Sequence, residues 1–546
     1  MQVMATSNGV DATINKVEAA LEGFEKDSLS IEQQDEFLRR HEDLRRVGTD
    51  PKFCGGSVAC FPFFPGTRYC HGDQPDCDMK LSSETENLFT VLRQSAKPKP
   101  ISAIQKLIED GPDRDLCRIN ALAFAARHKL NEEDVLAAFL HGARLGIFDM
   151  SWNILCPACG GVLDSGATLK TVKQAEYTCV LCAAGYEPTL DEIVEVTFTI
   201  SPRVRKIAAH DPGTLPWIEY YRQIFWSSGV DLPDDETLAK WFKETTLDIR
   251  ELSAGEKAVL SLQLPKGDVT VFDPVVHMSQ DIEVKGEPAR ESQSLAFVMT
   301  KDHASAGTIQ MRPGPLQMTL ENRSNVRTLP AIWIVSDKVH DLVRKRRPFL
   351  TAKRLLTNQT FRDIFRTDAL DVDQRLKITS LTFLFTDLKG STELYERVGD
   401  LVAYDLVRAH FRVLNEIVAA ESGAVVKTIG DAVMATFPTP DRAMAAALKM
   451  REALKELKGD LLLKIGIHEG PCLAVSLNDR QDYFGRTVNI AARVQGLATS
   501  RSIFATRRVV TDSEASKLLQ SNGIAATPEK RSLRGIANQV EIFEIP

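Results

Sequence analysis

The sequence predicts a multidomain α+β protein, and three observations lead to this fold class. The chain has 546 residues, which is too long for one compact core and favours roughly three or four domains. Within residues 193–340, apolar and polar residues alternate with a period of two, which is typical of β-strands. Within residues 380–546, short apolar runs and longer helical patterns follow the order βαββαβ. The change in pattern predicts different kinds of folding unit.

Composition and charge restrict the classes of protein that this chain can represent. With 43% hydrophobic and 26% charged residues, the composition is that of an ordinary globular protein. The formal net charge of −7 argues against general nucleic-acid binding. No run of about 18 apolar residues predicts a membrane span, and the N-terminus lacks the features of a signal peptide. We therefore expect a cytoplasmic protein without a nucleic-acid partner.

The N-terminal segment, residues 1–99, combines a polar helical pattern with a cysteine-rich stretch. The helical pattern is compatible with a solvated helix or with a segment that binds a partner. Four cysteines lie within 24 positions, namely Cys54, Cys60, Cys70 and Cys77. They could bind a second metal, remain unliganded thiols, or form a redox-sensing disulfide. Their irregular spacing matches no common zinc pattern, so unliganded thiols are the preferred interpretation.

The next unit, residues 100–150, is predicted to be helical. Residues 118–128 and 132–145 have helical apolar spacing and are separated by a short break at Leu130-Asn131. Two short helices in this order resemble a helix-turn-helix, so DNA binding is an alternative. The second helix is acidic and apolar at the positions where base-reading side chains would lie. A helical packing unit is therefore preferred.

Residues 151–192 carry a metal-binding spacing of cysteines. The pattern is Cys-x2-Cys, 19 residues, and Cys-x2-Cys, formed by Cys156, Cys159, Cys179 and Cys182. Four thiolates in two tight turns complete a tetrahedron around Zn²⁺ and leave no open position. The pattern predicts a zinc ribbon with a structural, non-catalytic metal.

Residues 193–340 are predicted to form a β-rich regulatory domain, and residues 341–379 a helical linker. Short alternating strands between Gly and Pro turns favour an antiparallel β-sandwich, although helical patches at 216–226 and 235–246 leave an α/β mixture open. The residue types give no catalytic group, and Trp333 is expected to be a packing residue. The linker begins with a basic run at 343–347, for which a solvated face is preferred over contact with lipid or nucleotide.

Three short motifs in residues 380–546 carry the candidate chemistry. The motifs are Leu381–Thr392, Val425–Ala435 and Asp482–Arg493. Asp387 ends the predicted strand of the first motif, and Asp431 lies at the turn of the second. Asn489 and Arg493 lie four residues apart on one face of a predicted helix. Two carboxylates at strand ends, a phosphate-sized turn and an Asn/Arg pair predict metal-assisted phosphoryl chemistry on a nucleotide.

These three motifs, in this order and spacing, resemble the catalytic domain of class III adenylate and guanylate cyclases. The resemblance covers roughly the last third of the chain. It implies a ferredoxin-like α/β fold and active sites shared between two subunits placed head to tail. The N-terminal part resembles only in general terms the bacterial multidomain cyclases that carry a zinc ribbon.

The resemblance also assigns roles to particular residues. Asp387 and Asp431, with the carbonyl of Leu388, would bind two Mg²⁺ or Mn²⁺ ions, since hard cations prefer oxygen ligands. Asn489 and Arg493 match the pair that orients the ribose and stabilises the transition state. The remaining matches are the base-selecting Lys427 and Asp482, and the phosphate-binding Arg534.

Lysine and aspartate at the base-selecting positions predict ATP as the substrate, because their donor and acceptor complement adenine and oppose guanine. All site residues are present in one chain, so a homodimer could form two complete sites. We therefore expect an adenylate cyclase regulated by its N-terminal domains through an unknown ligand or protein. The alternatives are a catalytically silent nucleotide-binding module and a zinc-ribbon regulator that binds nucleic acid.

Overall fold

The computed structural model describes residue 82 onward, with short gaps. The gaps are 174–175, 302–304, 336, 366–369, 371–373, 390, 457–461, 478–479, 499–501 and 537–538. The described residues belong to one unit of the chain, Asp78–Pro546. The predictions for Cys54, Cys60, Cys70 and Cys77 lie outside the described residues.

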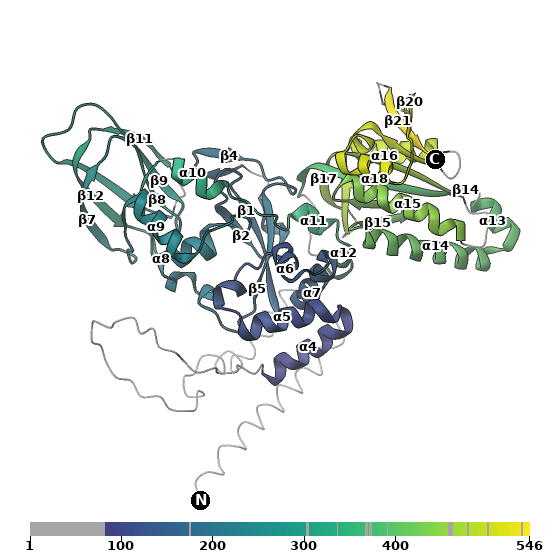
Figure 1. The fold of residues 1–546 in the computed structure, drawn as a ribbon, viewed down its shortest axis with the longest axis horizontal. Coiled ribbons are helices and arrows are strands. Elements are labelled where there is room, and N and C mark those ends of the chain that lie inside the picture. The colour runs from purple at the N-terminus through teal and green to yellow at the C-terminus, as the bar shows by residue number, and fades with distance from the viewer. Residues whose placement is uncertain are drawn as a thin grey trace, which may run out of the picture. The chain divides into compact units, whose positions relative to one another are not determined.

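Four helices open the described part of the chain (Figure 1). They are α4 (Ser83–Ser95), α5 (Pro98–Asp110), α6 (Ala121–His128) and α7 (Glu132–Arg144). Asn120 caps α6 by accepting the N–H groups of Leu122 and Ala123, so this helix begins three residues later than its apolar pattern suggests. The buried side chains of α7 include Val135, Leu136 and Phe139. This helix therefore packs into the core, in agreement with the preferred interpretation.

A three-stranded sheet with the order β2-β1-β5 follows the helices. Its strands are β1 (Phe148–Leu155), β2 (Val162–Gly166) and β5 (Val194–Ile200). Between β2 and β5 lies a small hairpin of β3 (Tyr177–Cys179) and β4 (Ala184–Tyr186). Because β1 pairs with β5, the sheet joins residues on both sides of the 151–192 segment.

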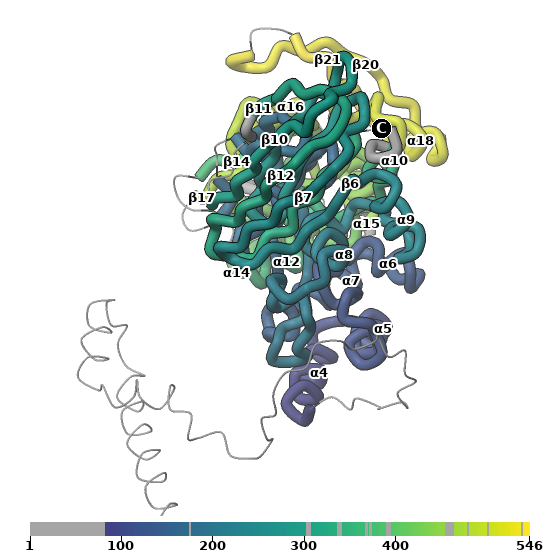
Figure 2. Tube along the Cα trace, turned by 90° about the vertical axis from the view of Figure 1, so that its left-hand side faces the viewer, coloured from purple at the N-terminus to yellow at the C-terminus, as the bar shows by residue number. Residues whose placement is uncertain are grey.

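Two further sheets form the β-rich part of the chain, and both contribute to one hydrophobic cluster. One has the order β10-β12-β7, whose strands run side by side in Figure 2, and the other has the order β11-β9-β8-β13-β6. The strands are β6 (Thr246–Ile249), β7 (Lys257–Leu264), β8 (Gly267–Asp273), β9 (Met278–Val284), β10 (Gln293–Met299), β11 (Ser305–Met311), β12 (Gly314–Asn322) and β13 (Ala331–Ile334).

The prediction that these strands are all antiparallel is wrong for two pairs. β10 pairs with β12 in parallel, and β11 pairs with β9 in parallel. In both cases the strand between the two in sequence, β11 for the first pair and β10 for the second, belongs to the other sheet. The chain therefore crosses between the sheets and returns in the same direction. Alternating polarity predicts which face of a strand is buried, but it contains no information about the direction of the neighbouring strand.

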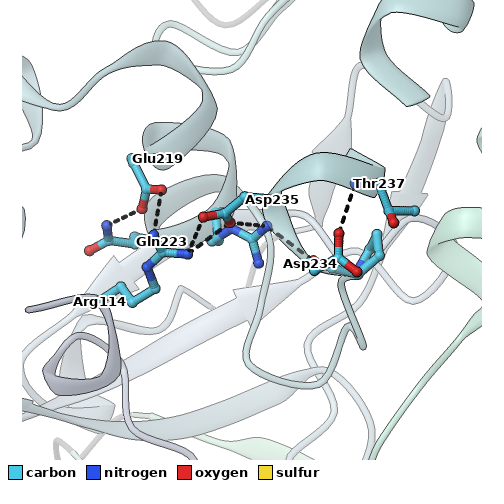
Figure 3. A network of polar contacts seen from close by, with 8 residues as sticks. Arg114, Glu219, Gln223, Asp234, Asp235 and Thr237 are labelled. Carbon is cyan, nitrogen blue, oxygen red and sulfur yellow. Dashed lines mark hydrogen bonds and ion pairs between the residues drawn. The ribbon is translucent and has the colours of Figure 1, made fainter. Parts of the chain in front are cut away.

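Helical segments cover the outer face of the five-stranded sheet, and a polar network fixes their ends. They are α8 (Trp217–Tyr220), the π-helical turn η6 (Tyr221–Phe225) and α9 (Asp235–Thr245). Figure 3 shows Arg114 between the carboxylates of Glu219 and Asp235, at 3.5 and 2.8 Å. Asp234 caps α9 by accepting the N–H of Thr237.

The linker contains α10 (Asp337–Arg344), α11 (Ala352–Leu356) and α12 (Gln359–Ile364). Arg346 and Arg347 of its basic run are exposed, in agreement with the preferred interpretation of a solvated face, and each also donates a hydrogen bond to the preceding region. Arg346 donates to the carbonyl of Ala158 at 2.8 Å, and Arg347 donates to that of Ser228 at 2.7 Å. Each guanidinium donates to one carbonyl, and these two bonds connect the linker to the preceding region.

The C-terminal domain is built on an eight-stranded sheet with helices packed against it (Figure 1). The main path is β15-β16-β14-β17-β19-β21-β20, and β18 pairs with β17. The strands are β14 (Leu376–Lys389), β15 (Ala424–Ile429), β16 (Ala432–Phe437), β17 (Leu462–Leu477), β18 (Arg480–Phe484), β19 (Ile503–Thr506), β20 (Thr527–Arg531) and β21 (Val540–Ile545).

The helices of this domain are α13 (Ser391–Val398), α14 (Asp400–Ala420), α15 (Pro440–Glu456), α16 (Arg486–Leu497), α17 (Arg507–Val510) and α18 (Ser513–Ser521). The first helical segment of the order βαββαβ consists of two helices, α13 and α14, because Gly399 lies between them at a φ of +77°. The elements from β14 to β17 follow the predicted order βαββαβ.

Candidate active site and cysteine cluster

The two carboxylates of the first and second motifs lie close together in the structure. Asp387 is near the end of β14, and Asp431 is in the turn between β15 and β16. The strand β16 pairs directly with β14. Gly430 makes this turn possible with a φ of +63°, a conformation that glycine adopts without strain. Burial raises the pKa of Asp387, the charge of Asp431 raises it further, and Lys464 acts in the opposite direction.

The surroundings of Asp431 fit a cation. Its Oδ2 is buried and has no hydrogen-bond partner among the described residues. A carboxylate oxygen in this state is costly, because it has lost water without gaining a donor. Two neighbouring carboxylates of which one is unsatisfied have the oxygen ligands and the negative charge that a divalent ion requires. Leu388 has a buried side chain and follows Asp387 in β14, so it is in sequence position to offer its carbonyl.

Sequence reasoning missed two residues beside these carboxylates. Lys464 of β17 is the cross-strand partner of Asp387, and its Nζ lies 3.8 Å from Asp387 Oδ2. His410 of α14 is buried, and burial lowers its pKa to about 4 although the charge of Asp431 favours the protonated form. Lys464 could have been noticed in the sequence, because it is a charged residue within the apolar strand 462–467. No local signal marks His410, since its position depends on how α14 packs.

The two predicted base-selecting residues are in direct contact. Lys427 of β15 and Asp482 of β18 form an ion pair with a separation of 2.5 Å between Nζ and Oδ2. The lysine side chain is 43% exposed and the aspartate 10% exposed, so the pair presents the lysine to solvent. Asp482 also accepts the backbone N–H of Tyr483 at 2.8 Å, which orients the carboxylate.

The predicted transition-state pair lies on α16. This helix packs so closely on β17 that a Cβ at Gly466 would come within 2.1 Å of the backbone nitrogen of Gln495. Asn489 is exposed, and Arg493 is half-buried. The guanidinium of Arg493 lies beside Gly535, where an added Cβ would be 3.5 Å from Nη2. The exposed Arg534 precedes this glycine, so α16 and the predicted phosphate-binding turn are neighbours.

Within one chain, the candidate residues form three sets that no described hydrogen bond or ion pair joins directly. In the described part of the chain, no hydrogen bond or ion pair joins Asp387 or Asp431 to the pair on β15 and β18. In the same described residues, no hydrogen bond or ion pair joins Asn489 or Arg493 of α16 directly to either of these sets. The three sets nevertheless lie on neighbouring elements, because α16 packs on β17 and a hydrogen bond from its Gln495 lowers the pKa of Asp387, which burial raises.

The linker contacts the strands that carry the base-selecting pair. Gln359 of α12 accepts the N–H of Val425 at 2.7 Å, and Arg362 donates to the carbonyl of Gln481 at 2.8 Å. Tyr483 donates its hydroxyl to the carbonyl of Leu356 at 3.3 Å. The hydrogen-bonded residues in β18 immediately flank Asp482, so a shift of α11 or α12 would move this carboxylate.

The four cysteines of the predicted zinc ribbon form one cluster. The Sγ atoms of Cys156, Cys159, Cys179 and Cys182 all lie within 4.8 Å of one another. The pair Cys156–Cys182 is 3.7 Å apart and the pair Cys159–Cys179 is 3.8 Å apart. These separations are far longer than a disulfide bond, and they equal the roughly 3.8 Å between ligands in a tetrahedron with Zn–S distances of about 2.3 Å.

The backbone around the cluster also suits thiolate ligands. The N–H of Cys159 donates to Cys156 Sγ at 3.5 Å, and the N–H of Gly161 donates to Cys159 Sγ at 3.4 Å. Donors of this kind favour the charged sulfur, because a hydrogen bond to the ionised form stabilises it. The donor set and its spacing fit a tetrahedral Zn²⁺ ion.

Comparisons with known proteins define the class of the C-terminal domain. Residues 374–539 match the adenylate and guanylate cyclase catalytic domain. This confirms the resemblance of the three motifs, and the C-terminal domain is a class III cyclase domain. The chain as a whole belongs to a family of unknown function, DUF5939, whose model matches residues 82–363.

Curated relatives match the cyclase region. An adenylate cyclase of Rhizobium meliloti is 33% identical over 132 residues, which are 21% of this chain and 36% of that protein. An adenylate cyclase of Anabaena cylindrica is 27% identical over 180 residues, which are 30% of this chain and 34% of that protein. The chain thus spans about a third of the length of these relatives. The solved adenylyl cyclase CyaB from P. aeruginosa is 20% identical, with 32% of this chain and 96% of that chain covered and a TM-score of 0.28.

In the described part of the chain, no helix has both the length and the apolar character that a membrane span requires.

Proposed function

We propose that this protein is an adenylate cyclase, which converts ATP to 3′,5′-cyclic AMP and pyrophosphate. The observation that carries the choice of ATP is the contact between Lys427 and Asp482 in a cyclase domain. It places a hydrogen-bond donor and an acceptor side by side, which is the pattern that the adenine edge requires.

The base-selecting pair discriminates through its hydrogen-bond directions. Lys427 would donate to adenine N1, and Asp482 would accept from the N6 amine. Guanine presents an N–H and a carbonyl at these positions, so both contacts would become unfavourable. A buried polar group without a partner costs about 1–3 kcal/mol, which is enough for strong selectivity when two such groups act together.

Asp387, Asp431 and the carbonyl of Leu388 are the proposed ligands of two Mg²⁺ or Mn²⁺ ions. Such ions, when bound, lower the pKa of the ribose 3′-hydroxyl and neutralise charge on the triphosphate. The protein supplies an unsatisfied buried oxygen at Asp431, which makes the site ready for a cation. Burial raises the pKa of Asp387, and the charge of Asp431 raises it further, so a bound cation would relieve both effects.

The remaining residues bind and orient the nucleotide. Asn489 would hold the ribose, and Arg493 would place its guanidinium against the charge that develops on the α-phosphate. Removing one such donor commonly costs about 10²–10³ in rate. Arg534, in the turn beside Arg493, would hold the terminal phosphates.

A homodimer with head-to-tail cyclase domains would complete two sites. The resemblance to class III cyclases implies that residues of two subunits complete each site. Apolar side chains near the base-selecting pair support such a contact. Ile429 is 54% exposed, Leu477 is 49% exposed, and Phe484 is 66% exposed. Exposed apolar side chains of this size beside a site favour burial against a partner.

The N-terminal region is proposed to regulate the catalytic domain. We propose a structural Zn²⁺ on Cys156, Cys159, Cys179 and Cys182 and a sandwich-like, β-rich regulatory domain formed by the strands from β6 to β13. The hydrogen bonds from α11 and α12 to β15 and β18 support this role, because they connect the linker to the strands of the base-selecting pair.

The test is a direct assay of the purified protein with ATP or GTP and with Mg²⁺ or Mn²⁺. The proposal predicts cyclic AMP as the main product. It also predicts that the rate per mole of protein rises with protein concentration, because dimers form. The matched variants are Asp431→Asn in the site and Asp405→Asn on the exposed face of α14. No cyclic nucleotide from either substrate would favour a silent nucleotide-binding module instead.

A further inference from the structure

A cavity of about 560 Å³ lies in the N-terminal region, far in sequence from the catalytic motifs. One wall is the outer face of the five-stranded sheet, with Thr270 of β8 and Asp281 of β9. The opposite wall is formed by η6, α9 and the loops of the cysteine cluster, including Cys159 and Cys182. The size is that of a site for a small organic molecule.

Aromatic rings form much of the lining. Trp226, Trp241 and Trp333 all face the cavity, together with Tyr221 and Phe225. The ring centres of Trp241 and Trp333 are 5.3 Å apart, and those of Trp226 and Trp241 are 6.3 Å apart. These rings come from η6, α9 and β13 and their flanks, so the fold gathers three of the five tryptophans of the chain at one place.

The charge of the lining is negative. Asp268, Asp281 and Glu283 line the cavity, and none of its described lining residues is a lysine or an arginine. Glu283 is already paired with Lys285 at 2.9 Å. Asp281 is half-buried and accepts the hydroxyl of Thr270, and no cationic group among the described residues pairs with it.

We propose that this cavity binds a small organic cation, such as a quaternary or tertiary ammonium compound. The faces of tryptophan rings attract such cations through their quadrupole, and the attraction is strongest when the cation loses water. Asp281 supplies the opposite charge, and no cation among the described residues competes for it. The buried Nε1 of Trp226 has no partner in the described structure, so it is available to a hydroxyl or carbonyl oxygen of the ligand.

The alternative of a plain apolar ligand explains the rings but not the charges. The carboxylate of the half-buried Asp281 would be left beside an apolar ligand without a cation. An anionic ligand would meet these same charges and no described cation. The organic cation is therefore the ligand class that satisfies both the rings and the carboxylates.

The experiment titrates the full-length protein with choline and with its neutral carbon isostere, in which a tert-butyl group replaces the trimethylammonium group. Calorimetry and tryptophan fluorescence report binding. We expect saturable binding of choline, at least about tenfold weaker binding of the isostere, and quenched tryptophan emission. Equal binding of both compounds, or binding of neither, overturns the proposal.

Variants locate the site. Asp281→Asn keeps the acceptor for Thr270 and removes the charge, so choline binding should weaken about tenfold or more. Glu283 lines the same cavity, but Glu283→Gln removes a charge that Lys285 already neutralises. Choline binding should therefore change less than about twofold. Trp241→Leu should abolish binding, and Trp241→Phe should retain part of it. Unchanged affinity in both Asp281→Asn and Trp241→Leu would exclude this cavity.

Discussion

The catalytic domain and the cavity of the N-terminal region carry chemistry in two different ways. In the catalytic domain, each candidate group lies in a short motif, such as Asp387 at a strand end or Asn489 and Arg493 on one helix face. In the cavity, Trp226, Trp241 and Trp333 are distant in sequence and meet only through the packing of η6, α9 and β13. The first arrangement is visible in a sequence, and the second requires the fold.

This difference teaches what each region depends on. The catalytic carboxylates need only two adjacent strands in register to come together. The cavity also needs the cysteine cluster, whose loops provide Cys159 and Cys182 to its wall. Damage to the cluster should therefore disturb the N-terminal region more than the catalytic carboxylates, and the predictions below test that contrast.

The largest effect is expected at the catalytic carboxylates. Asp387→Asn should lower kcat by about 10³ or more, because it removes a proposed metal ligand. The thermal stability should stay equal or rise, since the substitution removes a carboxylate whose pKa is raised first by burial and then by the charge of Asp431. Steady-state kinetics and calorimetry measure both. An active Asp387→Asn protein would contradict the assignment, and Asp405→Asn serves as the control.

Loss of the metal at the cysteine cluster should have the next largest effect. Mass spectrometry should find stoichiometric zinc in the purified protein. A strong chelator, or Cys179→Ser, should destabilise the N-terminal region by at least about 3 kcal/mol, because metal binding and folding are coupled. Cys117→Ser, at a cysteine outside the cluster, should change little. Zinc-free protein with an unchanged melting temperature would show that the cluster needs no metal.

A smaller effect is expected when the base-selecting pair is exchanged. Lys427→Glu together with Asp482→Cys should reduce the preference for ATP over GTP by about 10² in kcat/KM, because the donor and acceptor pattern is reversed or lost. Competition between the two substrates measures this ratio. The choline affinity should remain unchanged, which separates the two regions. An undiminished preference for ATP would show that other residues select the base.

The smallest effect concerns His468 of β17. Burial lowers the pKa of this histidine to about 4. The unfolded chain binds a proton near pH 6.5, so the free energy of unfolding should fall as the pH drops from about 6.5 to 4. His468→Gln keeps a polar partner for Thr506 and should lessen this loss by about 1–2 kcal/mol. Denaturant titrations at several pH values check it. Identical pH dependence in both proteins would exclude His468 as a source.

Much of the catalytic domain, and the cysteine cluster of the N-terminal region, could be predicted from the sequence, because local patterns determine them. The strand and helix order from β14 to β17, the hairpin around Gly430 and the tetrahedral set of cysteines all follow from short motifs. Lys464 and His410 were missed, because their places depend on strand register and helix packing. The parallel pairs of β10 with β12 and of β9 with β11 were missed because alternation contains no direction.

The most direct test of the central claim is a single reaction with equimolar ATP and GTP, full-length protein and Mg²⁺ or Mn²⁺, in which both cyclic products are resolved by mass. The account predicts that cyclic AMP predominates and that Asp387→Asn abolishes it. Equal amounts of cyclic AMP and cyclic GMP, or cyclic AMP formation that survives Asp387→Asn, would contradict the account.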